Sequence, residues 1–173
     1  MLTPEQEQWV NHLSDIKTIA IFPFDPTCEE KFLVIKNKVQ DILGTDQPAE
    51  HHGASSLGIS GQDEIDMYVP VAPVDFDAVI EKLKPIFGEP GSYYQLQRAR
   101  FTTYLEGKRI DIFVINKDHV SWYEMLAFEN YLRIHAEALE EYRKLKEFLA
   151  GKSVREYYRS KTEFINGILS KVS

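Results

Sequence analysis

Three acidic residues on two predicted strands form the part of this sequence best suited to chemistry. Glu64 and Asp66 lie in a stretch where apolar and polar side chains alternate, which predicts a strand with both carboxylates on one face. Asp111 lies in a second such stretch, so the three acids converge if the two strands are neighbours. Carboxylate oxygens and substrate phosphate are the ligands that Mg²⁺ prefers. We therefore predict Glu64, Asp66 and Asp111 as metal ligands and catalytic residues.

The same acids also have a simpler interpretation. Acids at strand ends are often solvated or paired with arginine, and Arg98, Arg100 and Arg109 are close in the sequence to Asp111. The acids by themselves favour this structural interpretation.

The chain just before the first acidic strand has the composition of an anion-binding turn. Residues 53–56 read Gly-Ala-Ser-Ser, which gives small side chains and accessible backbone N–H groups. Arginines of the aromatic region 91–105 could hold phosphates through charge-assisted hydrogen bonds, or could be ordinary surface charges of a hairpin. The predicted nucleotide contacts are Gly53, Ala54, Ser55, Ser56, Arg98 and Arg100.

Two adjacent histidines, His51 and His52, precede this turn. In an extended segment their side chains must point to opposite faces. His51 could act as a proton shuttle or orient a ligand, although such a histidine more often has a hydrogen-bonded structural role.

Composition restricts the class of protein. The chain has 173 residues, which fits one domain, and a net charge of −7, which disfavours broad binding to nucleic acid. Cys28 is the only cysteine, so no intrachain disulfide can form. The start lacks the pattern of a signal peptide, and no apolar run approaches the roughly 18 residues of a membrane span. We expect a cytoplasmic protein.

The order of predicted elements indicates an α/β (α+β) fold with a mixed sheet flanked by helices and a helical tail. We expect a single domain over residues 1–173, with an accessory helix in 1–17, a core in 18–115 and a tail in 121–173. Strands are predicted at 18–22, 64–69 and 109–115, with a hairpin turn at 106–108, and helices at 3–14, 28–43, 74–87 and from 121 to 172 with breaks near 135 and 151–152.

Several segments together are similar to one known family. Phe24-Asp25-Pro26 resembles an opening Tyr-Asp-Pro, and Glu50-His51-His52-Gly53 resembles a Glu-His-Val-Gly segment. Trp122 and the segment 126–133, Leu-Ala-Phe-Glu-Asn-Tyr-Leu-Arg, resemble the helix that follows. The sequence is identified as a member of the GrpB family, whose proteins resemble the nucleotidyltransferase (DNA polymerase β-like) superfamily in fold.

This resemblance implies a Mg²⁺-dependent nucleotide site, but the sequence departs from the pattern at its centre. The small pair of the pattern, Gly followed by Gly or Ser, reads Gly53-Ala54 here, and two histidines of a later strand are replaced by Asp111 and Phe113. One alignment places Asp66 and Tyr68 at the two acidic positions, and another places Glu64 and Asp66 there.

We therefore consider two hypotheses from different classes. In the first, the domain binds Mg²⁺ and a nucleotide and transfers a nucleotidyl group to an acceptor that the sequence does not identify. In the second, it is a catalytically inactive relative that binds a small ligand or a protein. A third role, RNA binding, is disfavoured by the acidic charge.

Overall fold

The computed structural model describes residues 1–172. The chain divides into two compact units, which are described separately. The sheet unit contains residues Phe24–Gly58 and Asp63–Tyr123. The helical unit contains Met1–Pro23, Ile59–Gln62 and the residues from Glu124 onward.

The sheet unit is built on one mixed five-stranded sheet, as predicted. The strand order is β1 (Glu50–His52), β2 (Glu64–Val71), β5 (Lys108–Asn116), β4 (Arg98–Leu105) and β3 (Ser92–Tyr94). Strands β2 and β5 are parallel neighbours, and the other pairs are antiparallel. The two strands that carry the predicted acids are therefore adjacent.

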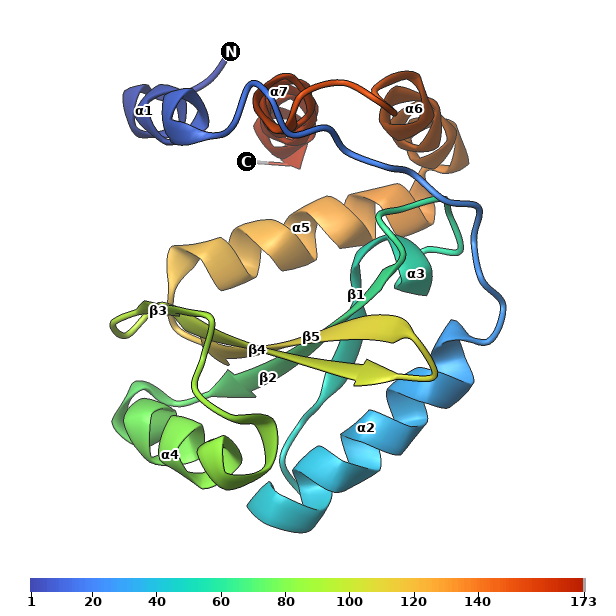
Figure 1. Ribbon diagram of the computed structural model, residues 1–173. Helices are drawn as coiled ribbons and strands as arrows, with labels where there is room; N and C mark the ends of the chain where they lie inside the picture. The colour runs from blue at the N-terminus through green and yellow to red at the C-terminus, as the bar shows by residue number, and fades with distance from the viewer. Residues whose placement is uncertain (173) are drawn as a thin grey trace. The chain divides into compact units, whose positions relative to one another are not determined.

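Two helices cover one face of this sheet. They are α2 (Cys28–Leu43) and α4 (Phe76–Phe87), which follows the short 3₁₀ helix η1 (Pro73–Asp75) (Figure 1). Along β2 every second side chain is buried, because Ile65, Met67 and Val69 point toward the helices. The opposite face of β2 therefore carries the polar side chains.

The helical unit holds α1 (Pro4–His12), α6 (Ala136–Phe148), α7 (Val154–Val172) and most of α5 (Val120–Ile134). Thr3 begins α1 with a capping box, as the Thr-Pro sequence predicts. Three aromatic rings join α5, α6 and α7, namely those of Phe128, Tyr142 and Phe164. The centroid of the Tyr142 ring lies 5.3 Å from the centroid of each of the other two. The predicted helical tail is confirmed.

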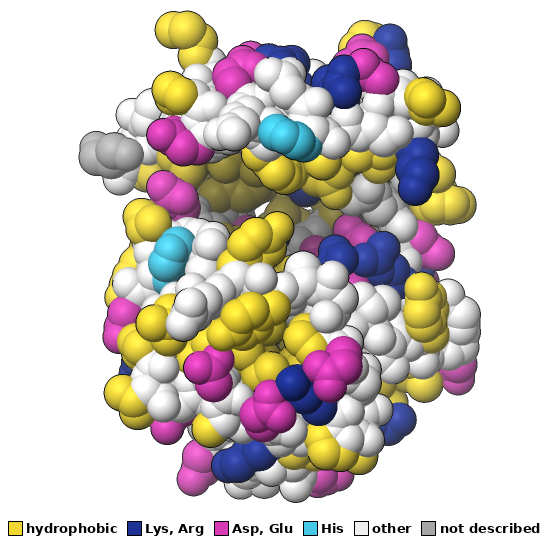
Figure 2. Space-filling model, turned by 60° about the vertical axis from the view of Figure 1, so that its left-hand side comes forward, with side chains coloured by type: hydrophobic (Ala, Val, Ile, Leu, Met, Phe, Trp, Pro, Cys, Tyr) yellow, Lys and Arg dark blue, Asp and Glu magenta, His cyan; other side chains and the backbone are white. Residues whose placement is uncertain are grey.

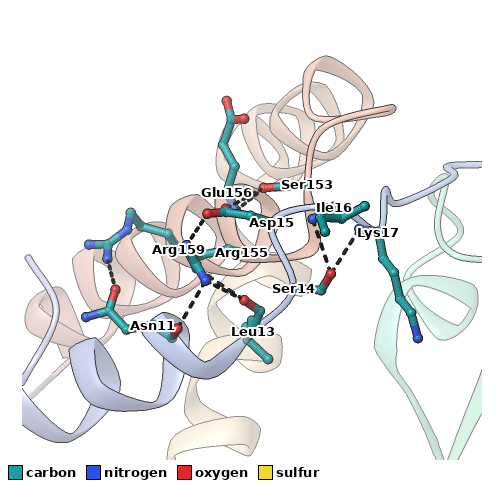
Figure 3. Close-up of polar contacts among 10 residues, drawn as sticks. All are labelled: Asn11, Leu13, Ser14, Asp15, Ile16, Lys17, Ser153, Arg155, Glu156 and Arg159. Atoms are coloured by element: carbon teal, nitrogen blue, oxygen red, sulfur yellow. Dashed lines mark hydrogen bonds and ion pairs between the residues drawn. The ribbon is translucent and has the colours of Figure 1, made fainter.

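Polar side chains attach the N-terminal helix to α7 (Figure 3). Arg155 donates to the Leu13 carbonyl over 2.9 Å and pairs with Asp15. Arg159 makes a bidentate pair with Glu7 at 2.7 and 2.8 Å. The end of α1 is thus fixed by arginines that are distant in sequence.

The predicted strand at 18–22 is wrong. This segment makes only two isolated bridges, Thr18 with Ser153 and Phe22 with Gly61. Its apolar residues satisfy the composition of a strand, but Pro23 ends the segment and no neighbouring strand continues the ladder.

One side of the sheet unit carries exposed hydrophobic side chains. Figure 2 shows the side that bears β3 and α4, where hydrophobic side chains gather among charged ones. Tyr93, Tyr94 and Leu96 are each 45–50% exposed. The edge strand β3 is only three residues long, which leaves little backbone for a further strand to pair with.

Within residues 1–172, none of the helices combines the length and the apolar composition that a membrane span requires.

Candidate functional site

The polar face of the sheet brings the predicted acids onto adjacent strands. In the parallel register of β2 and β5, Asp66 lies opposite Asp111, and Glu64 lies opposite Arg109. Side chains opposite each other on neighbouring strands share a face. The condition on which the acids could converge, that their two strands are neighbours, is therefore met for Asp66 and Asp111.

Asp111 is held by two hydrogen-bond donors. Thr102 of β4 donates to Oδ1 over 2.6 Å. Arg109 donates to both carboxylate oxygens, from Nε over 3.2 Å and from Nη2 over 2.8 Å. The Asp111 side chain is 3% exposed, so this bidentate pair compensates a buried charge.

Arg109 also approaches Glu64, the first of the three predicted acids. Its Nη1 lies 3.8 Å from Oε2 of Glu64. Burial disfavours the charged guanidinium, but attraction and hydrogen bonding to Asp111, with a contribution from Glu64, raise the pKa of Arg109. One guanidinium therefore stands between two of the three predicted metal ligands.

The three acids are not gathered into a single ligand group in this arrangement. Within residues 1–172, no group of three or more His, Cys, Asp and Glu side chains is placed to hold a metal ion. Carboxylates suit Mg²⁺ chemically, but both oxygens of Asp111 already accept from Arg109. The assignment of Glu64, Asp66 and Asp111 as ligands stays a prediction.

The turn after β1 lies directly against Asp66. Gly53 has φ of +77°, and a Cβ built there would overlap Oδ2 of Asp66 and lie 3.2 Å from its Cγ. This close approach and the left-handed backbone both require glycine. The glycine turn therefore lies beside one of the three predicted acids, Asp66.

Gly53→Ala is expected to lower the free energy of unfolding by about 1–3 kcal/mol, because it combines an unfavourable φ with a clash. Chemical denaturation measures this loss. Gly167→Ala is the control, since Gly167 lies within α7 and an added Cβ meets nothing within 4 Å. That variant is expected to be neutral or stabilising by up to about 1 kcal/mol. Equal stability of Gly53→Ala and the native chain would contradict the close approach.

The small residues after Gly53 form the one-turn helix α3 (Gly53–Ser56) rather than an open loop. The Ser55 hydroxyl lies 2.9 Å from Nε2 of His51, and the Ser56 hydroxyl donates to the Gly53 carbonyl over 3.0 Å. The role of this segment in phosphate binding stays a prediction.

Two arginines of β4 remain without an acidic partner. Arg98 and Arg100 are half-buried, and the Nε of each is buried without a hydrogen-bond partner in the described part of the chain. Neither forms an ion pair within residues 1–172. They alternate along β4 with buried Ala99, so both lie on the polar face.

An aromatic cluster that the motifs did not predict lies beside these arginines. Tyr68 stacks on Phe113 with ring centroids 4.7 Å apart, and Trp122 lies 5.8 Å from Tyr68. The guanidinium carbon of Arg98 lies 5.7 Å from the centroid of the Phe113 ring. It also lies 5.4 Å from the centroid of the Tyr94 ring. Tyr68 and Phe113 are two residues beyond Asp66 and Asp111, so the strand period could have placed them on this face.

The two histidines point to opposite faces, as predicted. His52 lies on the polar face, 5.3 Å from Tyr68 in an edge-to-face arrangement. His51 stacks on Phe32 of α2, with centroids 4.7 Å apart and planes 13° apart.

Comparison with known proteins identifies the family and supports the fold. The family model described as GrpB protein matches residues 18–171. The chain belongs to the GrpB family. The crystal structure of conserved protein GrpB from Enterococcus faecalis superposes with a TM-score of 0.70 at 23% identity, covering 88% of this chain and 98% of that one. No curated protein matches the chain significantly.

In this GrpB-family chain, the Asp-Pro motif has a structural role that sequence reasoning missed. Asp25 of the motif lies 3.0 Å from Nζ of Lys108, the first residue of β5, and Asp63, which precedes β2, also bonds to that ammonium. The Lys108 side chain is 8% exposed. One buried lysine thus joins the starts of α2, β2 and β5.

This GrpB-family fold also accounts for the departures from the family pattern. Tyr68, at one possible acidic position, is part of the aromatic cluster, and Phe113, which replaces a histidine, is its stacking partner. The two departures are therefore coupled in space.

Proposed function

We propose that the sheet unit binds an anionic small molecule with a planar ring, and that a nucleotide is the class that fits best. The single observation that carries this proposal is the pair Arg98 and Arg100, which form no ion pair within residues 1–172 and lie beside aromatic rings on the same sheet face. Guanidinium groups recognise phosphate through paired hydrogen bonds. A phosphate on these arginines would supply the negative charge that neither guanidinium meets as an ion pair within residues 1–172.

The aromatic cluster supports the ring of such a ligand. Planar bases stack on aromatic side chains with about 1–3 kcal/mol each. Tyr68, Phe113 and Trp122 are adjacent to Arg98, so one ligand can reach both rings and guanidinium groups. The neighbouring acids Glu64 and Asp66 can accept from sugar hydroxyls or base amino groups.

Transfer of a nucleotidyl group by Mg²⁺ remains a separate hypothesis. The register that places Asp66 opposite Asp111 supports it, whereas the bidentate pair of Arg109 with Asp111 opposes it. With the acids as placed, we derive no catalytic step through the metal. The binding proposal requires no metal.

Calorimetric titration with ATP and with inorganic triphosphate tests the proposal, each in Mg²⁺ and in excess chelator. We expect ATP to bind more tightly than triphosphate, because only ATP has a ring, and to bind without Mg²⁺. Arg100→Met is expected to weaken ATP binding by about tenfold or more, as the loss of a charge-assisted hydrogen bond predicts. Arg143→Met is the control, since Arg143 pairs with Glu140 and Glu147 on an exposed helix surface.

The other outcomes separate the hypotheses. Binding that requires Mg²⁺ and is lost in Asp66→Asn and Asp111→Asn would replace this proposal by the metal-dependent one. Absence of ATP and triphosphate binding in both conditions would reject both and favour a protein-interaction role.

A further inference from the structure

A hydrogen-bonded chain of serine, histidine and glutamate lies on the other face of β1, away from the polar face. The Ser55 hydroxyl lies 2.9 Å from Nε2 of His51, and Nδ1 of His51 lies 2.9 Å from Oε2 of Glu29. Both separations lie within the roughly 2.6–3.2 Å that join a nucleophile to its base and the base to the group that orients it. The three residues come from α3, β1 and the first turn of α2.

The bond to Glu29 determines the direction of the other bond. An ionised carboxylate only accepts hydrogen bonds, so Nδ1 of neutral His51 must donate to Glu29. The remaining nitrogen, Nε2, then has a lone pair and accepts the proton of the Ser55 hydroxyl. This tautomer makes His51 a general base toward Ser55.

Packing keeps the imidazole in this orientation. The His51 ring stacks on Phe32 and its side chain is 9% exposed, whereas Glu29 is 64% exposed. The base is therefore held by a ring and by two hydrogen bonds. Ser55 itself is half-buried.

We propose that Ser55 is a nucleophile activated by His51, with Glu29 as a positioning residue, and that this site accepts the acyl group of small activated carboxylic esters. Ser55 Oγ bonds to the carbonyl carbon while its proton passes to Nε2 of His51. The ester C–O bond breaks and the leaving alcohol takes that proton. A water molecule, deprotonated by His51, then attacks the acyl-serine and releases the carboxylic acid and Ser55. The overall reaction consumes one ester and one water and gives one acid and one alcohol.

The sheet unit contains a matched control. The Ser121 hydroxyl lies 2.8 Å from Nδ1 of His119, and both residues are half-buried like Ser55. Within residues 1–172, no carboxylate bonds to His119. This second pair is a serine beside a histidine without an orienting acid.

The experiment is labelling of the full chain with a fluorophosphonate, which phosphonylates activated serines, followed by mass spectrometry of peptides. We expect one label, on Ser55, that is absent in Ser55→Ala and unchanged in Ser121→Ala. Hydrolysis of p-nitrophenyl acetate is expected to fall about 100-fold or more in Ser55→Ala, because that variant has no nucleophile to accept the acyl group. Labelling of Ser121 at the same rate as Ser55, or no label on either, would overturn the proposal.

The role of Glu29 has its own readout. Glu29→Gln is expected to lower the maximal rate of labelling about tenfold or more while the reversible binding constant of the reagent stays the same. Glu29→Asp is expected to recover part of that rate. Because Glu29 is exposed, neither variant should unfold the chain, which thermal denaturation verifies. Equal labelling rates in all three forms would show that the contact with Glu29 is only structural.

Discussion

Replacing Lys108 by methionine is expected to lower the free energy of unfolding by about 1–2 kcal/mol, because the change removes the ammonium that Asp25 and Asp63 share, while both acids keep contact with water. Methionine has similar length, so the cavity contributes little and the lost charge dominates. Lys108 joins Asp25 and Asp63, which belong to segments distant in sequence. Lys117→Met, at an exposed position just after β5, is the control and is expected to change stability by less than about 0.5 kcal/mol.

The loss should depend on pH in a defined direction. Hydrogen bonds from Thr27, and then from Lys108, hold the pKa of Asp25 well below its usual range. Burial opposes the charge of Lys108, but its bonds to Asp63 and Asp25 together outweigh burial and raise its pKa. A lowered carboxyl pKa stabilises the fold above the pKa of the unfolded chain, about 3.9, and this contribution disappears as pH falls further.

A raised lysine pKa has the opposite sign. Its contribution is complete below the unfolded value, about 10.4, and is lost as pH rises through the higher folded value. Between about pH 5 and 9 the difference between Lys108→Met and the native chain should therefore be constant, and it should shrink below about pH 4. Urea denaturation across this range measures it. A difference that stays constant down to pH 2 would contradict the ion cluster as its source.

Local patterns predicted the elements where spacing and terminators agreed. Helix α2 has the predicted bounds because Phe32, Ile35 and Val39 recur at helical spacing and Gly44 follows. The strand at 18–22 failed because strand composition does not supply a partner strand. Pairing is a property of the whole sheet, and 18–22 has only isolated bridges.

The candidate site was predictable to the same extent. The two-residue period placed Glu64 and Asp66 on one face of their strand, but the pairing that brings Asp111 opposite Asp66 had no local signal. Arg109 and Asp111 are two residues apart on one strand, so the same period also predicts that their side chains share a face and can pair. The sequence alone did not decide between this ion pair and a metal site. Contacts across distant segments, such as Lys108 with Asp25, had no local signal.

Arg109→Met is expected to have the second large effect, a loss of about 3 kcal/mol in the free energy of unfolding. The substitution leaves the carboxylate of Asp111, which is 3% exposed, with the Thr102 hydroxyl but without a compensating charge. Adding Asp111→Asn to Arg109→Met removes that uncompensated charge. The double variant should therefore be more stable than Arg109→Met alone, and a double-mutant cycle by chemical denaturation measures the coupling.

The same variant tests whether the guanidinium takes the place of a divalent ion. In the native chain Arg109 bonds to Asp111 and lies 3.8 Å from Glu64, so these acids already have a cation. Without it they should bind Mn²⁺ or Mg²⁺, and millimolar metal should raise the thermal midpoint of Arg109→Met much more than that of the native chain. The double variant with Asp111→Asn should lose this response. If instead metal stabilises the native chain as strongly as it stabilises Arg109→Met, the ion displaces the Arg109 side chain from the acids. The acids of β2 and β5 would then be a metal site even in the native chain.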